Sequence, residues 1–282
     1  MEDPQLFSDY GGAYRRLAAQ LLDEVWPSLS WPDAPQPVLE VGCGPGILTR
    51  EVLLPRLPPS TVIVASDVNP VMVKHAKEQN ALPAVKAYEV LDVMDDDVTK
   101  TAVWQHGPYG KVFGVMVLHW VPDNRRALHN IYKLLAPGGE AVFTLKAYCT
   151  MFDVYQYMAK NSRWSKYMKD FHKYITPYQN SKDPACDLRN LLIEEGFEPV
   201  TVKAEPRTYV FHSDSETRGA VKSVNAFISR IPDDEKESYI DDFLEGCYKV
   251  KMLTKEKDEK TGQITVFYHY ISMVAVARKP QH

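Results

Sequence analysis

Hydrophobic and polar positions follow two different rhythms along this chain. Residues 6–26 carry apolar side chains at helical spacing, which predicts one or two amphipathic helices. The segment 31–37 is rich in proline and predicts a linker that cannot continue a helix. From residue 38 to residue 147, short β-branched runs alternate with amphipathic segments, which predicts strands alternating with helices.

This middle region predicts five strands and three helices. The expected strands are 38–42, 61–66, 85–91, 111–118 and 140–147, the helices are roughly 46–54, 70–79 and 124–135, and a turn is expected at 136–139. Such alternation predicts a parallel sheet with right-handed crossovers. Ligands of these sheets bind at the carboxyl ends of the strands. The residues that follow the first four strands are therefore expected to converge at one edge.

The pattern changes after residue 147. Residues 150–195 are rich in aromatic side chains and predict a mostly helical region, and 215–253 predicts a second helical stretch. Strands are expected at 198–211 and 264–277, with a solvated charged loop at 255–262. We therefore expect an N-terminal helical segment at 1–30, a ligand-binding core at 38–147, and a helical cap at 148–282 that also carries the last two strands.

Composition and charge narrow the class of protein. Hydrophobic residues at 45% and charged residues at 25% are typical of a soluble globular protein, as one large domain or two. The net charge of -4 disfavours a nucleic acid or an acidic membrane surface as partner. The first residues lack the features of a signal peptide, and no apolar run approaches the roughly 20 residues of a membrane span. Four scattered cysteines predict free thiols in a reducing compartment, so we expect a cytoplasmic protein.

A glycine-rich turn follows the first strand and is the strongest local signal. Glu40 precedes Gly42, Gly44 and Gly46 in the pattern E-x-G-x-G-x-G, and a helix-like segment comes next. Glycine permits positive φ and close backbone approach, and the helix start favours an anionic or polar ligand. A dinucleotide fingerprint needs a third glycine at the position of Ile47, which disfavours a nicotinamide dehydrogenase.

This turn resembles the first motif of S-adenosylmethionine-dependent methyltransferases, although an ordinary strand-to-helix turn is the alternative. The resemblance implies that Glu40 contacts the methionine end of the cofactor and that the glycines make room for it. Cys43 lies inside the turn, where we interpret it as a small side chain rather than a nucleophile.

Acidic residues end the next two strands. Asp67 lies 25 residues beyond Gly42, where a carboxylate can accept both ribose hydroxyls of a nucleoside, or alternatively cap the next helix. Asp92 lies where methyltransferases place a polar residue against the adenine amino group, with an apolar neighbour beside the ring. The remaining residues expected to form the cofactor site are Val68, Met72, Val93 and Leu118.

The acidic triplet Asp95–Asp97 raises the question of a metal. Adjacent carboxylates on one helix cannot all face one ion, so a charge cluster at a helix N-terminus is the better interpretation. We expect no metal site.

The residues after the fourth strand indicate the acceptor. Methyltransferases that act on exocyclic amines of DNA bases carry an Asn or Asp, two prolines and an aromatic residue here, and that motif is absent. Trp120 offers an indole N–H donor at the mouth of the cofactor site, and His119 offers a second polar ring. Aromatic packing is the alternative for Trp120, and a structural role is the alternative for His119.

Later segments resemble the juvenile hormone acid methyltransferases of arthropods. The similar segments are 118–123, 126–135, 152–155 and 174–178, followed by Asp183-Pro184. Members of that family transfer a methyl group from S-adenosylmethionine to the carboxylate of juvenile hormone acid or farnesoic acid. The resemblance implies an α/β class I methyltransferase fold, with a Rossmann-like, mostly parallel sheet, an antiparallel last strand and a helical cap. It also implies S-adenosylmethionine as cofactor and a small lipophilic carboxylic acid as substrate.

One position departs from that family. Its N-terminal helix usually carries a glutamine that binds the substrate carboxylate together with the tryptophan corresponding to Trp120, and this position is Tyr14 here. A phenol donates one hydrogen bond but lacks the reach of a carboxamide, so the acceptor is left open. The side chains expected to bind the acceptor or line its pocket are Tyr10, Tyr14, His119, Trp120, Tyr148, Phe152 and Tyr155.

The expected reaction is an in-line displacement at the sulfonium methyl. A carboxylic acid with a pKa of about 4 to 5 is ionised at pH 7, so no general base is needed. Alignment and exclusion of water then supply the rate. Methylation of a different small acid or a hydroxyl group is one alternative, and a cofactor-binding protein with little turnover is another.

Overall fold

The computed structural model describes residues 3–32, 36–257, 259–260 and 264–281, and its centre is one mixed sheet. The strands are β1 (Val38–Val41), β2 (Ile63–Asp67), β3 (Val85–Val90), β4 (Tyr109–Val115), β5 (Leu135–Cys149), β6 (Glu198–Phe211), β7 (Leu253–Lys257) and β8 (Ile264–Arg278). Their order is β3-β2-β1-β4-β5-β8-β6, and β7 pairs with β8. Strands β1 to β5 pair in parallel, whereas β8 runs antiparallel to β5, β6 and β7. This arrangement confirms the predicted fold class.

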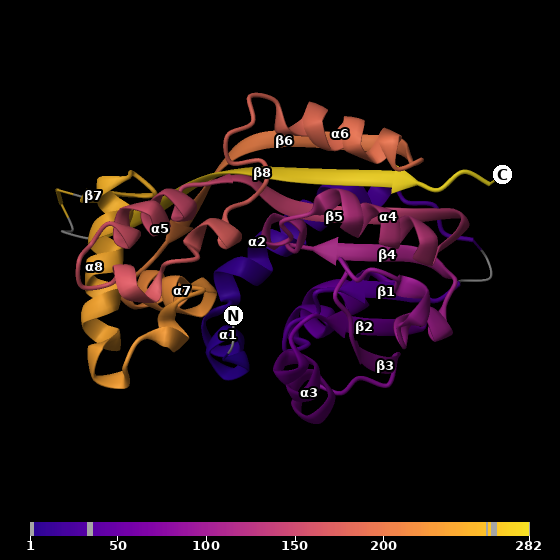
Figure 1. Ribbon diagram of the computed structural model, residues 1–282, viewed down its shortest axis with the longest axis horizontal. Helices are drawn as coiled ribbons and strands as arrows, with labels where there is room; N and C mark the ends of the chain where they lie inside the picture. The colour runs from indigo at the N-terminus through magenta and orange to yellow at the C-terminus, as the bar shows by residue number, and fades with distance from the viewer. Residues whose placement is uncertain (1–2, 33–35, 258, 261–263, 282) are drawn as a thin grey trace.

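The helices lie around this sheet. They are α1 (Pro4–Tyr10), α2 (Gly12–Val25), α3 (Pro70–Gln79), α4 (Asn124–Leu134), α5 (Met151–Ala159), α6 (Pro184–Glu194), α7 (Asp214–Val224) and α8 (Lys236–Lys249). Figure 1 shows α5, α7 and α8 gathered at one end of the molecule, and α3 below its middle, beside β2 and β3. Helix α1 contacts both α3 and α7. Helix α1 therefore lies between α3 and that end of the molecule.

The long strand β8 connects that end to the parallel strands. Its second half, from Tyr270 to Arg278, pairs with β5 beside the parallel strands, and its first residues, 264–268, pair with β7. Figure 1 shows β8 running from the group formed by β7 and α8 toward the C-terminus of the chain. The division of the chain into an N-terminal segment at 1–30, a core at 38–147 and a cap at 148–282 stays a prediction.

The predicted charged loop at 255–262 is wrong in its first part, because residues 253–257 form strand β7. Leu253 is buried, whereas Lys255, Glu256 and Lys257 are exposed. Charged side chains of this kind are tolerated, and often favoured, on an edge strand. The pairing with β8 is a long-range contact that a charge pattern does not reveal. Residues 258 and 261–263 lie outside the described residues.

Several element boundaries also differ from the expected ones. A π-helix at Thr49–Leu53 follows the glycine turn in place of a regular α-helix, and β5 already begins at Leu135, across the expected turn. The region 150–195 is helical only at α5 and α6, with short 3₁₀ turns at 165–167 and 171–174 between them. Strand β4 ends at Val115 instead of residue 118, because Met116 adopts a φ of 58°.

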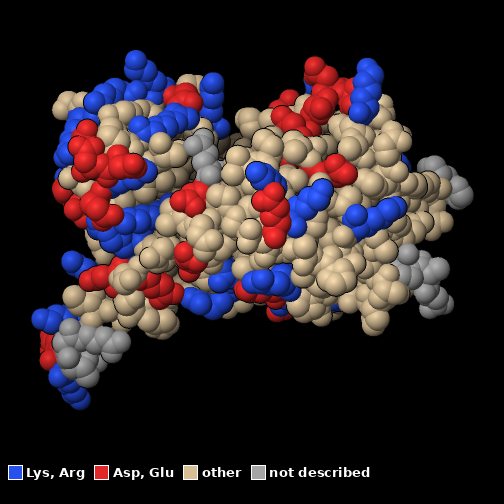
Figure 2. All heavy atoms as spheres, turned by 90° about the horizontal axis from the view of Figure 1, so that it is seen from below, with Lys and Arg blue, Asp and Glu red and all other residues tan. Residues whose placement is uncertain are grey.

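Many surface charges are paired with charges of the opposite sign. Figure 2 shows blue and red side chains mixed over the lobe that carries α7 and α8. There Arg218 pairs with both Glu237 and Asp241, which ties the two helices together. Within the described part of the chain, every helix is too short or too polar to cross a lipid bilayer.

Candidate active site

A cavity of about 290 Å³ opens at the carboxyl edge of the parallel strands. Its walls come from the segments that follow β1, β2, β3 and β4, together with residues of α1, α2 and the end of α7. This is the edge where the strand order reverses between β1 and β4, the usual ligand site of such sheets. The sequence prediction of a converging edge is therefore confirmed.

The glycine turn forms the floor of this cavity. Gly42 and Gly44 have φ of 77° and 54°, a region that L side chains rarely adopt. A Cβ on Gly42 would lie 2.2 Å from Cγ2 of Val117, whereas a Cβ on Gly44 would meet nothing within 4 Å. Gly42 is thus needed for close packing, and the space beside Gly44 is open to a ligand. Cys43 between them is buried, and burial raises the pKa of its thiol, as expected for a small packing residue.

Asp67 is fixed at the end of β2 by backbone donors. Its two carboxylate oxygens accept hydrogen bonds of 2.9 Å from the Gly44 N–H and the Asn69 N–H. Asp67 lines the cavity with lone pairs left for further donors, such as ribose hydroxyls. The next residue, Val68, lines the same wall and is 61% exposed. An exposed apolar side chain next to an oriented carboxylate suits a nucleoside.

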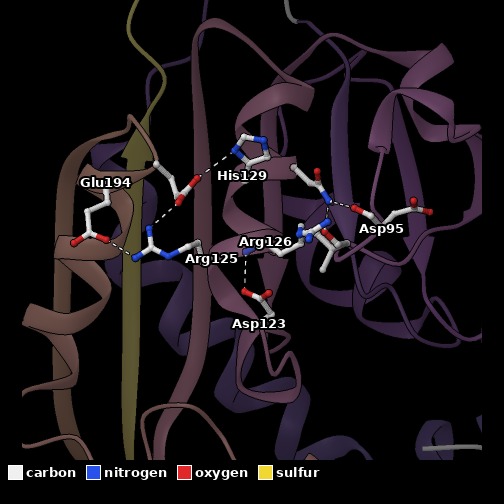
Figure 3. A network of polar contacts seen from close by, with 9 residues as sticks. Asp95, Asp123, Arg125, Arg126, His129 and Glu194 are labelled. Carbon is white, nitrogen blue, oxygen red and sulfur yellow. Dashed lines mark hydrogen bonds and ion pairs between the residues drawn. The ribbon is translucent and has the colours of Figure 1, made fainter.

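The loop after β3 is held in place from the side of α4. The Asn130 side chain donates hydrogen bonds of 2.9 and 2.8 Å to the carbonyl oxygens of Val93 and Asp95. Figure 3 shows the contact to Asp95 together with the Arg125 pair from α4 to Glu194 of α6. Arg126 of α4 also pairs with Asp96 of this loop. These contacts orient the segment that presents Asp92 and Val93 to the cavity.

Carboxylates of the triplet at 95–97 are engaged in local contacts. Asp95 accepts from the Asp97 N–H, Asp96 pairs with Arg126 at 2.9 Å, and Asp97 caps the 3₁₀ turn that begins at Val98. Across the residues that the structure describes, no three His, Cys, Asp or Glu side chains are arranged to hold a metal ion.

Trp120 lines the cavity opposite the glycine turn. Its Nε1 is buried and has no hydrogen-bond acceptor among the described residues. The ring is supported edge-to-face by Phe152, with a centroid distance of 6.0 Å, and lies 5.1 Å from the His119 ring. His119 itself is buried behind the wall, and burial together with the Lys146 charge lowers its pKa, so the imidazole is neutral at pH 7.

Tyr14 reaches the cavity from α2, but its hydroxyl hydrogen is already used. The Tyr14 hydroxyl donates a hydrogen bond of 2.9 Å to the Met116 carbonyl oxygen. Burial raises the pKa of Tyr14, which keeps the phenol protonated. The side chain therefore presents its ring and an acceptor oxygen to a ligand, rather than a free O–H donor.

Other predicted site residues lie outside the cavity wall. Gly46 and Leu118 pack beneath the two loops, Tyr10 lines a second cavity instead, and Tyr148 donates to Asp153 at 2.7 Å. Tyr155 is fully buried, and its hydroxyl accepts a hydrogen bond of 3.2 Å from the N–H of a wall residue, Ala226.

Glu40 lies under the glycine turn and does not line the cavity. Its Oε2 accepts a 2.6 Å hydrogen bond from the Thr49 hydroxyl, while Oε1 has no partner among the described residues. Burial raises the pKa of Glu40 to about 7. The acidic side chain beneath the turn is therefore partly protonated near pH 7.

Part of the wall was not found by sequence reasoning. Phe7 of α1, Tyr174, Val224 and Ala226 all line the cavity. These side chains come from segments far from the glycine turn in the sequence and carry no local motif. Only the packing of the cap against the N-terminal helices brings them to the site.

Comparisons with known proteins agree with this geometry. A family model described as a methyltransferase domain matches residues 10–202. Juvenile hormone acid O-methyltransferase of Bombyx mori is 24% identical over 99% of this chain and 98% of its own length. The enzyme of that name in Drosophila melanogaster is 27% identical over 99% of this chain and 93% of its own. Malonyl-[acyl-carrier protein] O-methyltransferase 1 of Ilyobacter polytropus is 29% identical over 48% of this chain and 47% of its own.

Solved structures share the fold. A putative methyltransferase from Bacillus halodurans aligns with a TM-score of 0.54 at 18% identity, covering 93% of this chain and 98% of that one. Phosphoethanolamine N-methyltransferase 2 of Haemonchus contortus, in complex with S-adenosyl-L-methionine, aligns with a TM-score of 0.51 at 14% identity over 93% of this chain and 52% of its own. The resemblance noted from the sequence is confirmed.

The residues present also fit the cofactor. The open side of Gly44, the oriented Asp67 carboxylate and the exposed Val68 offer backbone space, a hydroxyl acceptor and an apolar surface in one wall. These are the features that an adenosyl group with a charged amino acid tail requires. The chain belongs to the methyltransferase domain family, and it is a methyltransferase that uses S-adenosylmethionine.

Proposed function

We propose that this methyltransferase esterifies the carboxylate of a small lipophilic acid, of the farnesoic acid or juvenile hormone acid type. The observation that carries the proposal is the Trp120 indole N–H, which is buried in the cavity wall with no acceptor among the described residues. A buried donor without an acceptor costs roughly 1–3 kcal/mol. A carboxylate oxygen of the acceptor removes that cost and is thereby oriented.

A neutral donor suits this reaction. The substrate is an anion and the product is a neutral ester, so a strong cation at the reacting carboxylate would stabilise the ground state more than the transition state. Trp120 supplies one neutral hydrogen bond, which orients the carboxylate oxygen without strongly stabilising the ground-state anion. Because the acid is already ionised at pH 7, the neutral His119 need not accept a proton.

The remaining wall suits a hydrocarbon chain. Phe7, Val224 and Ala226 contribute apolar surface, and Tyr174 contributes an aromatic ring. Pockets for apolar ligands combine such walls with a few placed polar groups. These side chains would also exclude water from the reacting carboxylate, which strengthens the hydrogen bond from Trp120.

The cofactor would be held by backbone positions and side chains from the loops after β1, β2 and β3 and from α3. These are Gly42, Gly44, Asp67, Val68, Met72 and Asp92. Bound S-adenosylmethionine supplies a methyl group activated by its positively charged sulfur. Tyr14 holds the Met116 loop between the cofactor wall and the acceptor wall, and so contributes alignment rather than a second carboxylate donor.

The test is transfer of radiolabelled methyl from S-adenosylmethionine to farnesoic acid and to farnesol, the matched alcohol. We expect the acid and not the alcohol to be methylated. Trp120→Phe should lower kcat/KM for the acid about 100-fold, equivalent to roughly 2.7 kcal/mol. The affinity for S-adenosylhomocysteine should stay within threefold, because Trp120 lies on the acceptor side.

Other outcomes would reject the proposal. Methylation of the alcohol alone would indicate a hydroxyl acceptor. Tight binding of S-adenosylhomocysteine without transfer to any acid in a wider panel would indicate a cofactor-binding protein. Tyr14→Gln, assayed in parallel, shows whether the carboxamide usual in the related family increases transfer to farnesoic acid.

A further inference from the structure

A second, smaller cavity of about 60 Å³ adjoins the first. Tyr14 and Val224 line both cavities, so the two cavities lie on either side of these side chains. The second cavity is mostly aromatic and aliphatic, with Tyr209, Phe211 and Tyr268 among its lining residues. Among its described lining residues, the one charged side chain is Lys146.

Lys146 lies on β5 and is 8% exposed. Its Nζ lies 5.0 Å from the centroid of the Tyr268 ring and 5.8 Å from that of Tyr270. Among the described residues, no carboxylate lies within 4 Å of this ammonium and none accepts a hydrogen bond from it. The nearby Cys149 thiol and Tyr268 hydroxyl are hydrogen-bonded to each other at 3.0 Å. Lys146 therefore faces the cavity without an anion.

The buried lysine on β4 provides the contrast. Lys111 is 4% exposed, and its Nζ forms an ion pair of 2.6 Å with Glu140. A buried ammonium costs several kcal/mol unless it is paired, and cation–π contacts return only about 0.5–2 kcal/mol. Burial accordingly lowers the pKa of Lys146. This fold supplies a counter-ion for one buried lysine and leaves a cavity beside the other.

We propose that the second cavity binds a second carboxylate of the acceptor against Lys146, while the reacting carboxylate lies at Trp120. The proposal rests on the proposed function, since it extends the same acceptor site. Lys146 lines only the second cavity, whereas Gly44, Asp67 and Trp120 line only the first. Lys146 therefore does not line the cavity of the reacting group, although its charge acts on His119 beside Trp120. We expect a lipophilic acid with a second carboxylate to bind more tightly than the matching monoacid and to be methylated at one end.

A carboxylate is the anion that fits this place. The cavity is small and its lining carries a single positive charge, which balances a monovalent group and leaves a phosphate dianion half uncompensated. The aromatic rings of Tyr209 and Tyr268 leave little room for the hydration that a dianion retains.

The test is calorimetric titration of the protein loaded with S-adenosylhomocysteine. The probes are α,ω-dicarboxylic acids of 8 to 14 carbons and the monocarboxylic acids of the same lengths. We expect at least one diacid to bind 10-fold or more tightly than its matched monoacid. Lys146→Met should abolish this preference and leave monoacid affinity within twofold, while Lys146→Arg should retain part of it. Lys133→Met, which removes an exposed lysine of α4, is the control and should change neither affinity.

Three results would overturn the inference. One is a wild-type protein that does not discriminate diacids from monoacids at any length, a result that needs no variant to fold. Another is an equal loss for both classes in Lys146→Met, which would place Lys146 at the reacting carboxylate. The third is a retained preference in that variant. Methyl transfer with radiolabelled cofactor separates the two proposals. Diacid binding without transfer would reject the proposed function alone. Transfer to monoacids and diacids with equal efficiency would reject this inference alone.

Discussion

The Tyr14 hydroxyl and the Met116 carbonyl oxygen lie 2.9 Å apart in a hydrogen bond that joins α2 to the loop after β4. Met116 has a φ of 58°, which is unfavourable for a residue with a side chain. Its own N–H donates to the Thr144 carbonyl oxygen at 2.7 Å. Helix α2 and strand β5 thus hold this residue from both sides, in the wall of the cavity.

Tyr14→Phe tests the weight of that hydrogen bond. The variant keeps the ring but leaves the buried Met116 carbonyl without its donor, so we expect the free energy of unfolding to fall by about 1–3 kcal/mol. Urea unfolding measures the change. Tyr10→Phe removes the hydroxyl of a tyrosine that is 45% exposed and should change stability by less than about 0.5 kcal/mol. Equal effects of the two substitutions would contradict the structural role of Tyr14.

Alanine substitutions at two glycines of the same turn should have different effects, one mainly on stability and the other mainly on cofactor binding. Gly42→Ala places a Cβ 2.2 Å from Val117 and should lower the unfolding midpoint strongly. Gly44→Ala meets no protein atom within 4 Å, so its stability cost should be limited to about 1–2 kcal/mol for the positive φ. Its methyl group occupies cofactor space, and S-adenosylhomocysteine should bind at least 10-fold more weakly by calorimetry. Undiminished binding by Gly44→Ala would place the cofactor elsewhere.

The expected site residues that line the cavity are those with local signals. Glycines at positive φ and acidic residues at strand ends, such as Gly42, Gly44, Asp67 and Asp92, are specified by a few neighbouring residues. Parallel topology then brings the strand ends together without any further information. The part of the cavity formed by these strand ends could therefore be predicted from the sequence, although Glu40, Gly46 and Leu118 lie outside its wall.

The acceptor half depends on long-range packing. Tyr148 and Tyr155 are aromatic residues in the expected region, yet one is bonded to Asp153 and the other is buried behind Ala226. Lys146 lies within a predicted strand, and no local pattern indicates that it faces a cavity without a counter-ion. The position of α7, which brings Val224 to both cavities, follows from tertiary contacts with α1.

Glu40 predicts a pH dependence of stability. Its pKa is about 7 in the folded protein against 4.5 when solvated, because burial disfavours the carboxylate. The folded state therefore binds more protons than the unfolded state between these values, and the free energy of unfolding falls as the pH rises from about 4.5 to 7. At about 1.4 kcal/mol for each pH unit, the loss is roughly 3 kcal/mol.

Glu40→Gln isolates this contribution. The amide keeps an acceptor for Thr49 and cannot ionise, so the difference in unfolding free energy between the variant and the wild type should increase across this pH window and level off above it. Urea unfolding between pH 4.5 and 8 measures the difference. Glu78→Gln, an exposed position on α3, should give a flat difference. A flat difference for Glu40→Gln would mean that the carboxylate is stabilised by a contact not seen beneath the turn.

The last prediction concerns the contribution of the buried ion pair between Lys111 and Glu140 to the free energy of unfolding. These residues face each other across β4 and β5, with Nζ and Oε2 2.6 Å apart, and Arg278 of β8 contacts the other oxygen at 2.8 Å. Glu140→Gln leaves a buried ammonium without its anion, so we expect a loss of about 3–5 kcal/mol at pH 7.

The double variant Lys111→Met/Glu140→Gln should recover part of that loss, because it removes the charge that the single variant leaves unpaired. The lysine and arginine beside Glu140 hold its pKa below 4.5, so its contribution to the free energy of unfolding is present above that pH and is lost as the pH falls further. Urea unfolding of Glu140→Gln, Lys111→Met and the double variant, at pH 7 and pH 4, measures both effects. A double variant less stable than Glu140→Gln would mean that the pair stabilises β4 and β5 through packing of the lysine chain rather than through charge.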